Sequence, residues 1–194
     1  MITLCFATNN ANKIEEIRAQ LGSFFLLHNL QDVGCFEELP ETQPTIEGNS
    51  IQKATYVFGR YHVACFADDT GLEVETLNNE PGVFSARYAG PQKNSEDNID
   101  LLLSKLKGCA NRKARFKTVI TLADVRGMST FEGIVNGVIT TERRGSSGFG
   151  YDAVFQPEGF EKTFAEMSLT EKSKISHRAL AFHKLISFLK EKYV

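Results

Sequence analysis

Two adjacent carboxylates, Asp68 and Asp69, directly follow the apolar run "HVACFA" at residues 62–67. A short apolar run of this kind is typical of a buried strand. Two like charges at the end of such a strand cost free energy unless positive charge approaches them or one carboxyl holds a proton. Positive charge therefore has to be brought to this point, or one of the two carboxyls has to hold a proton.

Composition and charge exclude several classes of protein. The 194 residues are 42% apolar and 24% charged, which is ordinary for a globular domain with a core. The net charge of −2 indicates no general affinity for a nucleic acid polymer or an anionic membrane. No apolar stretch approaches the length of a membrane span, and "MITLCFATNN" is typical of a first strand rather than a signal peptide. The four cysteines form no C-x-x-C pair, so we expect no zinc site and a reducing, cytoplasmic location.

Hydrophobic periodicity predicts an α/β fold with a mixed sheet, in a single domain over residues 1–194. The predicted strands are 2–7, 24–28, 62–67, 71–77, 114–125 and 128–140. Four helices are predicted: one that ends at Leu21, one that ends at residue 59, one around residues 99–106 and one over residues 176–192. The strand at 71–77 has Leu72, Val74 and Thr76 on one face. Ligands in such folds bind beyond the carboxyl ends of strands, so we expect the chemistry at residues 8–13 and 68–71.

The turn "TNNANK", residues 8–13, leaves a predicted strand and opens a helix. Backbone N–H groups at a helix N-terminus attract anions, and Lys13 adds a positive charge. An ordinary capped turn is the alternative interpretation. No Walker pattern occurs in the sequence, so this turn is not a P-loop.

Glu41, Asp68 and Asp69 are acidic residues in or beside predicted loops. Carboxylate oxygens suit Mg²⁺, which is usually shared with substrate phosphates. One carboxylate of an adjacent pair can hold the metal while its neighbour accepts a proton from water. A turn with solvated charges is the alternative.

Two further segments contain residues that suit recognition of a base. In "SSGFGYD", residues 146–152, glycines flank Phe149, which could stack on a base or pack inward. "EKSKISHR", residues 171–178, places basic side chains around the start of the last helix, where they oppose the helix dipole. Such local disagreement is expected at functional sites. Together the segments favour a nucleoside triphosphate site without a P-loop.

Six segments occur in an order that carries a family resemblance over residues 2–183: "FATNNANKIEEI", "PETQPTIEGNSIQKA", "FADDTGLEV", "PGVFSARYAG", "SSGFGYDAVF" and "EKSKISHRALAF". The chain resembles the Ham1-like non-canonical purine nucleoside triphosphate pyrophosphatases, the inosine triphosphatase family. The resemblance implies Mg²⁺-dependent hydrolysis of ITP, dITP and XTP to the monophosphate and pyrophosphate. It also implies an elongated, two-lobed fold with a long mixed sheet flanked by helices, and a homodimer.

The resemblance also implies roles for individual residues. Asp69 would be the proton acceptor, and Glu41 with Asp68 or Asp69 would hold the metal. The implied substrate-binding residues are Thr8, Asn10, Lys13, Lys53 and Lys172 for the phosphates, Phe149, Gly150, Tyr151 and Asp152 for the base and sugar, His177 and Arg178 for reading the base, and Asn9, Ala11, Asn12, Thr70 and Arg87 as further candidates.

The sequence departs from the family pattern at two positions. Asn12 stands where glycine is frequent, and asparagine tolerates the left-handed backbone better than most residues, so we expect the turn to survive. Gly48 stands where an acid is frequent, so no metal ligand is expected there. A Maf-like pyrophosphatase acting on modified nucleotides and a catalytically silent nucleotide-binding protein remain alternatives. A glycosidase that uses Glu41 with an aspartate is a third.

Overall fold

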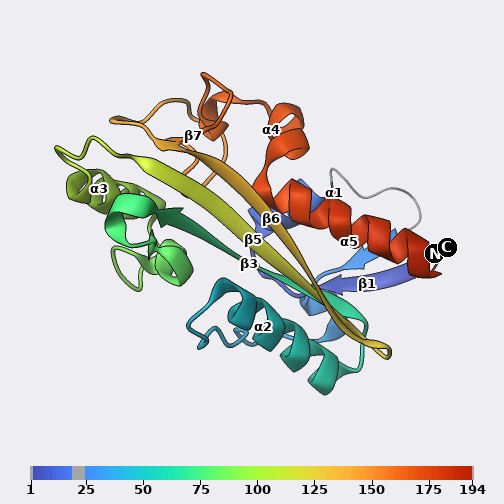
Figure 1. The fold of residues 1–194 in the computed structure, drawn as a ribbon. Coiled ribbons are helices and arrows are strands. Elements are labelled where there is room, and N and C mark those ends of the chain that lie inside the picture. The colour runs from blue at the N-terminus through green and yellow to red at the C-terminus, as the bar shows by residue number, and fades with distance from the viewer. Residues whose placement is uncertain (1, 19–24, 194) are drawn as a thin grey trace. The chain divides into compact units, whose positions relative to one another are not determined.

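The computed structural model describes residues 2–18 and 25–193. In these residues seven strands form one sheet in the order β2-β1-β3-β5-β6-β7, with β4 paired to β3 outside this path (Figure 1). The strands are β1 (Ile2–Phe6), β2 (Phe25–His28), β3 (Cys65–Val74), β4 (Glu80–Pro81), β5 (Lys113–Asp124), β6 (Gly127–Ile139) and β7 (Phe155–Pro157). The α-helices are α1 (Ala11–Arg18), α2 (Ile46–Tyr61), α3 (Ser95–Lys105), α4 (Leu169–Ile175) and α5 (His177–Tyr193). Short 3₁₀ helices are η1 (Gln31–Val33), η2 (Glu75–Leu77), η3 (Gly82–Arg87) and η4 (Phe164–Glu166).

The predicted α/β class with a mixed sheet is confirmed. Strand β1 pairs in parallel with β2 and β3, whereas β3 with β4 and β6 with β7 are antiparallel pairs. The predicted strands 114–125 and 128–140 correspond to β5 and β6, which form a hairpin because they are neighbours in the sheet and only residues 125 and 126 join them. A link this short permits only an antiparallel pair.

The chain divides into two compact units, each with its own core. The first unit comprises Met1–Asp69, Thr118–Gly133 and Arg178–Val194, and the second comprises Thr70–Lys117 and Ile134–His177. The chain therefore passes between the units at the peptide bonds Asp69–Thr70 and His177–Arg178, among others. That residues 1–194 act as a single domain stays a prediction.

In the first unit, side chains alternate between the two faces of the strands, as the period of two requires. One face packs on α1 and α5 and the other packs on α2, and Figure 1 shows α5 and α2 on opposite sides of the strands. The first cluster includes Leu4, Phe6, Ile17, Phe66, Ile120, Leu122, Phe182, Leu185 and Leu189. The second includes Cys5, Ala7, Cys35, Ala54, Val57, Cys65, Ala67 and Ala123.

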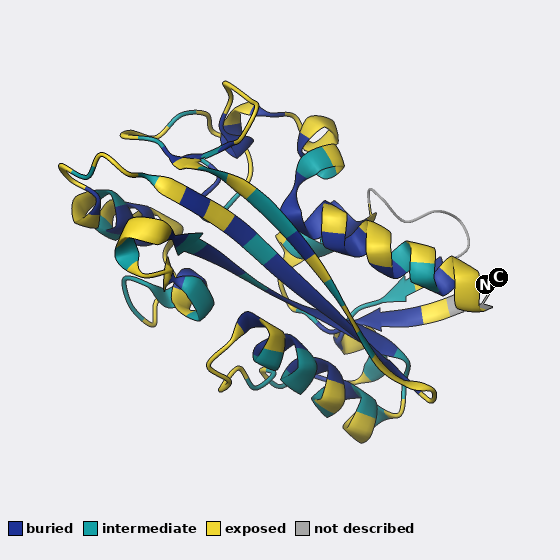
Figure 2. Cartoon of the chain, in the orientation of Figure 1, coloured by how far each residue is buried: buried dark blue, intermediate teal, exposed yellow. Residues whose placement is uncertain are grey.

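Strand β3 corrects the prediction of two strands with Asp68 and Asp69 in or beside a loop. Residues Cys65–Val74 form one continuous strand that is buried almost throughout (Figure 2). Both aspartates therefore lie in mid-strand, buried, and not at the end of a strand. Thr76 was placed in the same strand by its alternation, but it lies in η2.

The helices differ from the prediction mainly at their ends. Helix α1 ends at Arg18, and the predicted end at Leu21 and Gly22 lies outside the described residues. Helix α2 begins at Ile46, inside a stretch assigned to a loop, because the Thr45 hydroxyl caps it by accepting from the Gly48 N–H at 2.9 Å.

The second unit has one core, in which α3 and the strands pack around a group of aromatic rings. The rings of Phe116 and Phe155 meet edge to face at 4.7 Å between centroids. The cluster includes Leu72, Val74, Ile99, Leu102, Leu106, Ala114, Phe116, Ile139, Tyr151, Phe155, Phe164 and Met167. Across both units, no described helix is long and apolar enough to cross a membrane.

Candidate active site

Asp68 lies on the face of β3 that packs against α1 and α5. Its carboxylate accepts from the Lys13 ammonium of α1 at 2.8 Å and from Nε of Arg178 in α5 at 3.2 Å. Glu16 of α1 accepts from the same guanidinium, through Nη1. Burial by itself would raise the pKa of Asp68, but Lys13 and Arg178 outweigh it and hold that pKa well below its usual range. Asp68 is thus a fully buried carboxylate that stays ionised.

Asp69 points to the opposite face, toward α2. Its Oδ1 accepts from the Lys53 ammonium at 3.1 Å, and its Oδ2 accepts from the Asn49 amide at 3.4 Å. Lys53 also donates to Glu41 at 2.6 Å, so one ammonium holds two carboxylates. Burial raises the pKa of Asp69 above its ordinary value, and Lys53 offsets this only in part. The raised pKa makes Asp69 the better proton acceptor of the two aspartates.

The alternation of a strand explains how Asp68 and Asp69 can be neighbours. Successive side chains of β3 point to opposite faces, so each carboxylate meets its own cations. Asp68 shares its face with Phe66, which packs toward α5, while Asp69 shares its face with Ala67, which packs toward α2. The positive charge that the sequence required is supplied by three side chains of the first unit: Lys13, Lys53 and Arg178.

The turn at residues 8–13 is an exposed helix start. The Asn10 side chain accepts from the Lys13 N–H at 3.2 Å, and the Thr8 hydroxyl accepts from the Asn10 N–H at 3.2 Å. Asn9, Ala11 and Asn12 are exposed. Asn12 lies within α1 and is not among the residues with positive φ, so the expected need for a left-handed backbone at this position was wrong.

The segment at residues 148–152 forms a tight turn in the second unit. Asp152 Oδ2 accepts from the Phe149 N–H at 2.9 Å and from the Lys172 ammonium at 2.7 Å. That ammonium lies 4.8 Å from the centre of the half-buried Phe149 ring. Gly148 has a φ of 79°, and a Cβ there would come within 2.2 Å of Asp152 Oδ2, so only glycine fits.

Tyr151 and His177 are buried in the core of the second unit. The Tyr151 hydroxyl donates to the Ser85 carbonyl at 2.8 Å, and Gly150 precedes it with a φ of 61°. The His177 ring is buried and stacks on Phe116 with centroids 4.5 Å apart, so His177 is not a surface residue. His177 opens α5, as predicted.

Lys172 and Lys174 lie in the last turn of a separate helix, α4, and not at the start of the closing helix as predicted. Their charges therefore complement the dipole of α4. Thr70 follows Asp69 in β3 and belongs to the second unit. The Arg87 guanidinium, at the end of η3, lies 5.3 Å from the centre of the Phe84 ring.

The structure adds two residues that were not predicted. Glu16 of α1 accepts from Arg178, and Asn49 of α2 donates to Asp69. Their spacing carried a signal: Glu16 lies three positions after Lys13, and Asn49 lies four positions before Lys53. Residues so spaced share one face of a helix. Polar pairs at this spacing, on helices that otherwise bury an apolar face, could have identified both.

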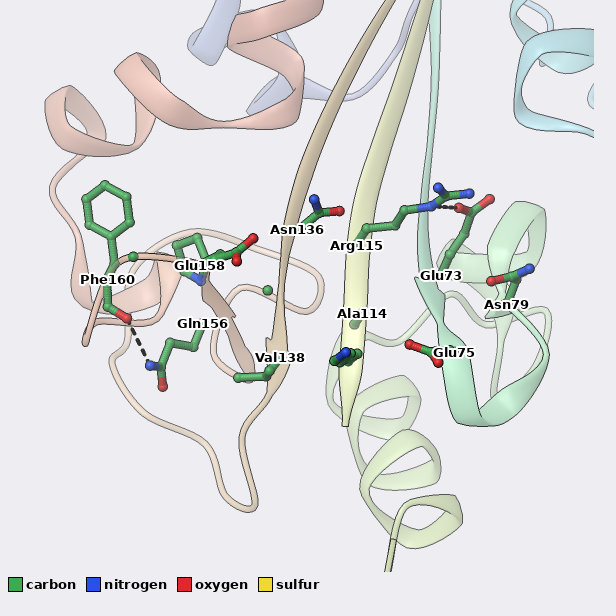
Figure 3. A pocket seen from close by; sticks show the side chains of 14 residues that line it. Glu73, Glu75, Asn79, Ala114, Arg115, Asn136, Val138, Gln156, Glu158 and Phe160 are labelled. Atoms are coloured by element: carbon green, nitrogen blue, oxygen red, sulfur yellow. Dashed lines mark hydrogen bonds and ion pairs between the residues drawn. The ribbon is translucent and has the colours of Figure 1, made fainter. Parts of the chain in front are cut away.

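A cavity of about 580 Å³ lies in the second unit, over β3, β5, β6 and β7 (Figure 3). Its wall includes the pair Arg115 and Glu73, whose charged atoms are 2.5 Å apart, together with Asn136 and Phe160. None of its lining residues is a predicted site residue. The cavity is therefore separate from the residues to which the sequence assigned chemistry.

The donor set around Asp69 fits a divalent cation that also binds phosphate. Among the described residues, no group of three or more His, Cys, Asp or Glu is placed to hold a metal by itself. Glu41 and Asp69, which share the Lys53 ammonium, are two carboxylates. Mg²⁺ usually takes one or two carboxylates together with water and substrate phosphates. The residues present fit that pattern.

The fold and these clusters define an α/β protein with a buried network of acids and cations and with a glycine-flanked aromatic turn. A model of the Ham1 family matches residues 4–188. The chain therefore belongs to the Ham1 family, and the resemblance inferred from six sequence segments is confirmed.

Relatives and solved structures agree with this membership. The chain is 54% identical to a protein of Flavobacterium psychrophilum named dITP/XTP pyrophosphatase, over 96% of this chain and 98% of that protein. It is 51% identical to a Porphyromonas gingivalis protein of the same name, over 97% and 98%. The solved Ham1 protein of Staphylococcus aureus has a TM-score of 0.91 at 36% identity, over 98% of this chain and 99% of that chain. A Mycobacterium abscessus structure titled nucleoside-triphosphatase and dITP/XTP pyrophosphatase has a TM-score of 0.78 at 37% identity, over 95% and 99%.

Proposed function

We propose that this chain hydrolyses non-standard purine nucleoside triphosphates, namely ITP, dITP and XTP, to the nucleoside monophosphate and pyrophosphate. Membership of the Ham1 family and the printed names of the relatives support this activity. The observation that carries the mechanism is the environment of Asp69. A buried carboxylate with a raised pKa lies beside Lys53, which also holds a second carboxylate. Removal of these triphosphates would keep them out of the nucleotide pool.

The first unit supplies the groups for phosphate chemistry. Lys13 and Lys53 carry positive charge beside Asp68 and Asp69, and the exposed start of α1 at residues 8–13 suits an anion. We assign binding of the substrate phosphates to Thr8, Asn9, Asn10, Ala11, Asn12, Lys13 and Lys53. Thr70, which follows Asp69 in β3, is a further candidate.

The metal is assigned to Glu41 and Asp69 rather than to Asp68. Oδ1 of Asp68 accepts from Lys13 and Oδ2 accepts from the buried Arg178, which makes Asp68 a carboxylate that positions both cations. Glu41 and Asp69 both accept from the Lys53 ammonium and lie nearer to solvent than Asp68. Mg²⁺ bound there would neutralise charge on the triphosphate and orient the attacking water.

The hydrolytic step requires one proton acceptor and one leaving group. The water oxygen attacks the α-phosphorus, the bond from that phosphorus to the oxygen of the β-phosphate breaks, and pyrophosphate leaves. Asp69 accepts the proton of the water, and Lys13 and Lys53 stabilise the negative charge that develops. Asp68 is less suited to this transfer because both of its oxygens accept from cations of the protein.

The second unit supplies candidates for recognition of the base and sugar. Phe149, held by Asp152 and beside Lys172, offers an aromatic face, and Gly150 and Tyr151 complete the turn. We assign His177 and its chain neighbour Arg178, which belongs to the first unit, to the 6-oxo group of the purine, and Arg87 to a supporting role. Adenine presents an amino donor in place of the 6-oxo acceptor, and a buried donor left without an acceptor costs about 1–3 kcal/mol.

The test is a pyrophosphate-release assay across ITP, dITP, XTP, GTP and ATP, together with modified pyrimidine triphosphates, with Mg²⁺ and with EDTA. We expect pyrophosphate and monophosphate from the first three substrates, only with Mg²⁺. Preference for the modified pyrimidines would favour the Maf-like alternative. Binding of ITP without turnover would identify a silent nucleotide-binding protein.

We also propose a homodimer in the cytoplasm. The four cysteines are free thiols, and three of them are buried, as suits a reducing compartment. Light scattering on the purified protein should give twice the mass of one chain. A monomeric mass at assay concentration would contradict the dimer.

A further inference from the structure

The side chain of Asn49, in α2, contacts two segments that carry carboxylates: the loop that contains Glu41, and strand β3 at Asp69. Its side chain is buried, with 1% of the residue exposed. The Asn49 Oδ1 accepts from the backbone N–H of Gln43 at 2.9 Å, two residues after Glu41. The Asn49 Nδ2 donates to Asp69 Oδ2 at 3.4 Å. One amide thus spans from the loop of Glu41 to Asp69.

The chemistry of the two partners determines which way this amide faces. A backbone N–H can only donate, so the atom opposite Gln43 has to be the amide oxygen. The NH₂ group then faces the Asp69 carboxylate, which accepts. A flipped amide would place its NH₂ against the Gln43 N–H and its oxygen against the carboxylate, losing both bonds. The arrangement therefore holds the loop and the carboxylate in one relative position.

Helix α2 holds the loop at residues 41–43 through three side chains on one helix face, at positions 49, 52 and 53. Gln52 accepts from the Thr42 N–H at 2.9 Å and donates to the Thr42 hydroxyl at 2.8 Å. Lys53 holds Glu41 and Asp69 by charge. Gln52 contacts the loop, whereas Asn49 contacts the loop and Asp69. This difference offers a matched control.

We propose that Asn49 is a positioning residue that fixes the spacing between Glu41 and Asp69 for the reaction. This inference rests on the proposed function, and it deepens that function by adding a residue that contacts neither substrate nor metal. Groups that orient metal-binding carboxylates affect metal affinity or activity by about ten- to a hundredfold when they are removed. An ammonium on a flexible stem, such as that of Lys53, attracts the two carboxylates without fixing their geometry.

The first experiment compares Asn49→Ala with Gln52→Ala in the full chain, using ITP and Mg²⁺. For Asn49→Ala we expect kcat to fall about ten- to a hundredfold with KM little changed, because the phosphate and base contacts remain. For Gln52→Ala we expect kcat within about threefold of the wild type, because Asp69 keeps its partners. An equal fall in kcat in both variants would overturn the proposed role of Asn49 at Asp69, because it would mean that Asn49 acts only by holding the loop.

A second variant separates the effects of the two hydrogen bonds that the Asn49 amide makes. Asn49→Asp keeps an acceptor for the Gln43 N–H but removes the donor to Asp69. Hydrogen exchange, measured without nucleotide, should leave the Gln43 amide as protected as in the wild type, whereas Asn49→Ala should lose that protection. With the loop intact, kcat should still fall by about tenfold or more. Wild-type kcat in this variant would overturn the proposal.

A binding measurement separates failure of this inference from failure of the proposed function. At saturating Mg²⁺, calorimetric titration of inosine α,β-methylene triphosphate should give similar nucleotide affinity for the wild type, Gln52→Ala and Asn49→Ala, whereas the Mg²⁺ concentration needed for half-maximal activity should rise in Asn49→Ala alone. If the wild type itself releases no pyrophosphate from ITP, the proposed function is wrong. If the wild type is active and Asn49→Ala matches it in kcat and in the Mg²⁺ concentration for half-maximal activity, only the inference on Asn49 is wrong.

Discussion

The two faces of β3 in the first unit each bury the carboxylate of an aspartate, but they compensate its charge in different ways. On the face of α1 and α5, Asp68 has no exposed side-chain surface and both of its oxygens are paired with cations, so its pKa is lowered. On the face of α2, the Asp69 side chain keeps 11% exposure, shares its cation with Glu41, and has a raised pKa. Two identical residues in sequence thus acquire different chemistry from their partners. A buried carboxylate that two cations contact is therefore held as a structural group, whereas one that accepts from a single shared cation and an amide keeps a raised pKa.

The largest expected effect is on catalysis by Asp69→Asn. Loss of the proton acceptor should lower kcat for ITP by about 10²–10⁴-fold, while the affinity for inosine α,β-methylene triphosphate stays close to that of the wild type. Pyrophosphate release and calorimetry measure the two quantities. Near-normal turnover would end the assignment of Asp69 as the base and the contrast between the two faces.

The matched variant Asp68→Asn should act on stability instead. It removes the carboxylate that the partly buried Lys13 and the buried Arg178 share, although Arg178 keeps Glu16, and breaking a buried ion pair from one side costs about 3–5 kcal/mol. Urea unfolding of Asp68→Asn beside Asp69→Asn measures the difference. If Asp69→Asn proves the more destabilising of the two, the assignment of structural and reactive carboxylates has to be reversed.

A smaller effect is expected from Arg178→Lys. The lysine keeps a positive charge, but it cannot reproduce the forked contact with Glu16 and Asp68 that sets the plane of the guanidinium. We expect the ratio of kcat/KM for ITP over ATP to fall by about tenfold. An unchanged ratio, with folding intact, would show that the purine is read by other residues.

The smallest effect concerns Glu37, a half-buried, hydrogen-bonded carboxylate of the first unit. Hydrogen bonds from Tyr61 and Tyr56 lower the pKa of Glu37 from 4.5 to about 2. Because the folded pKa lies below the unfolded value, Glu37 stabilises the fold above pH 4.5, and this contribution is lost as the pH falls toward 2. Thermal unfolding of Glu37→Gln should therefore differ from the wild type near neutral pH and converge with it in acid. A difference that grows in acid would contradict the sign of this shift.

Much of the site was accessible from the sequence because its residues lie in short, ordered motifs. The turn at 8–13 that opens α1 and the start of α5 at His177 were predicted where the structure has them, whereas Asp68 and Asp69 were expected at the end of a strand. The error at β3 has a physical cause: two aspartates and a glycine have low strand propensity, so they were assigned to a break. Cations from two helices compensate the buried charge and allow the strand to continue.

Glu16 and Asn49 escaped prediction because their importance comes from partners distant in sequence. Arg178 lies 162 positions from Glu16, and Asp69 lies 20 positions from Asn49. No local pattern records such a pairing, although the helical spacing to Lys13 and Lys53 was a usable hint.

By itself the sequence determined the α/β class and the family, since apolar periodicity and ordered motifs are properties of neighbours along the chain. Only the tertiary structure decided which carboxylate meets which cation. The reason is the pleat of β3, which turns consecutive side chains to opposite faces, and the packing of α1 and α5 on one face and α2 on the other. The distinction between Asp68 and Asp69 exists only after those helices have packed on the strands.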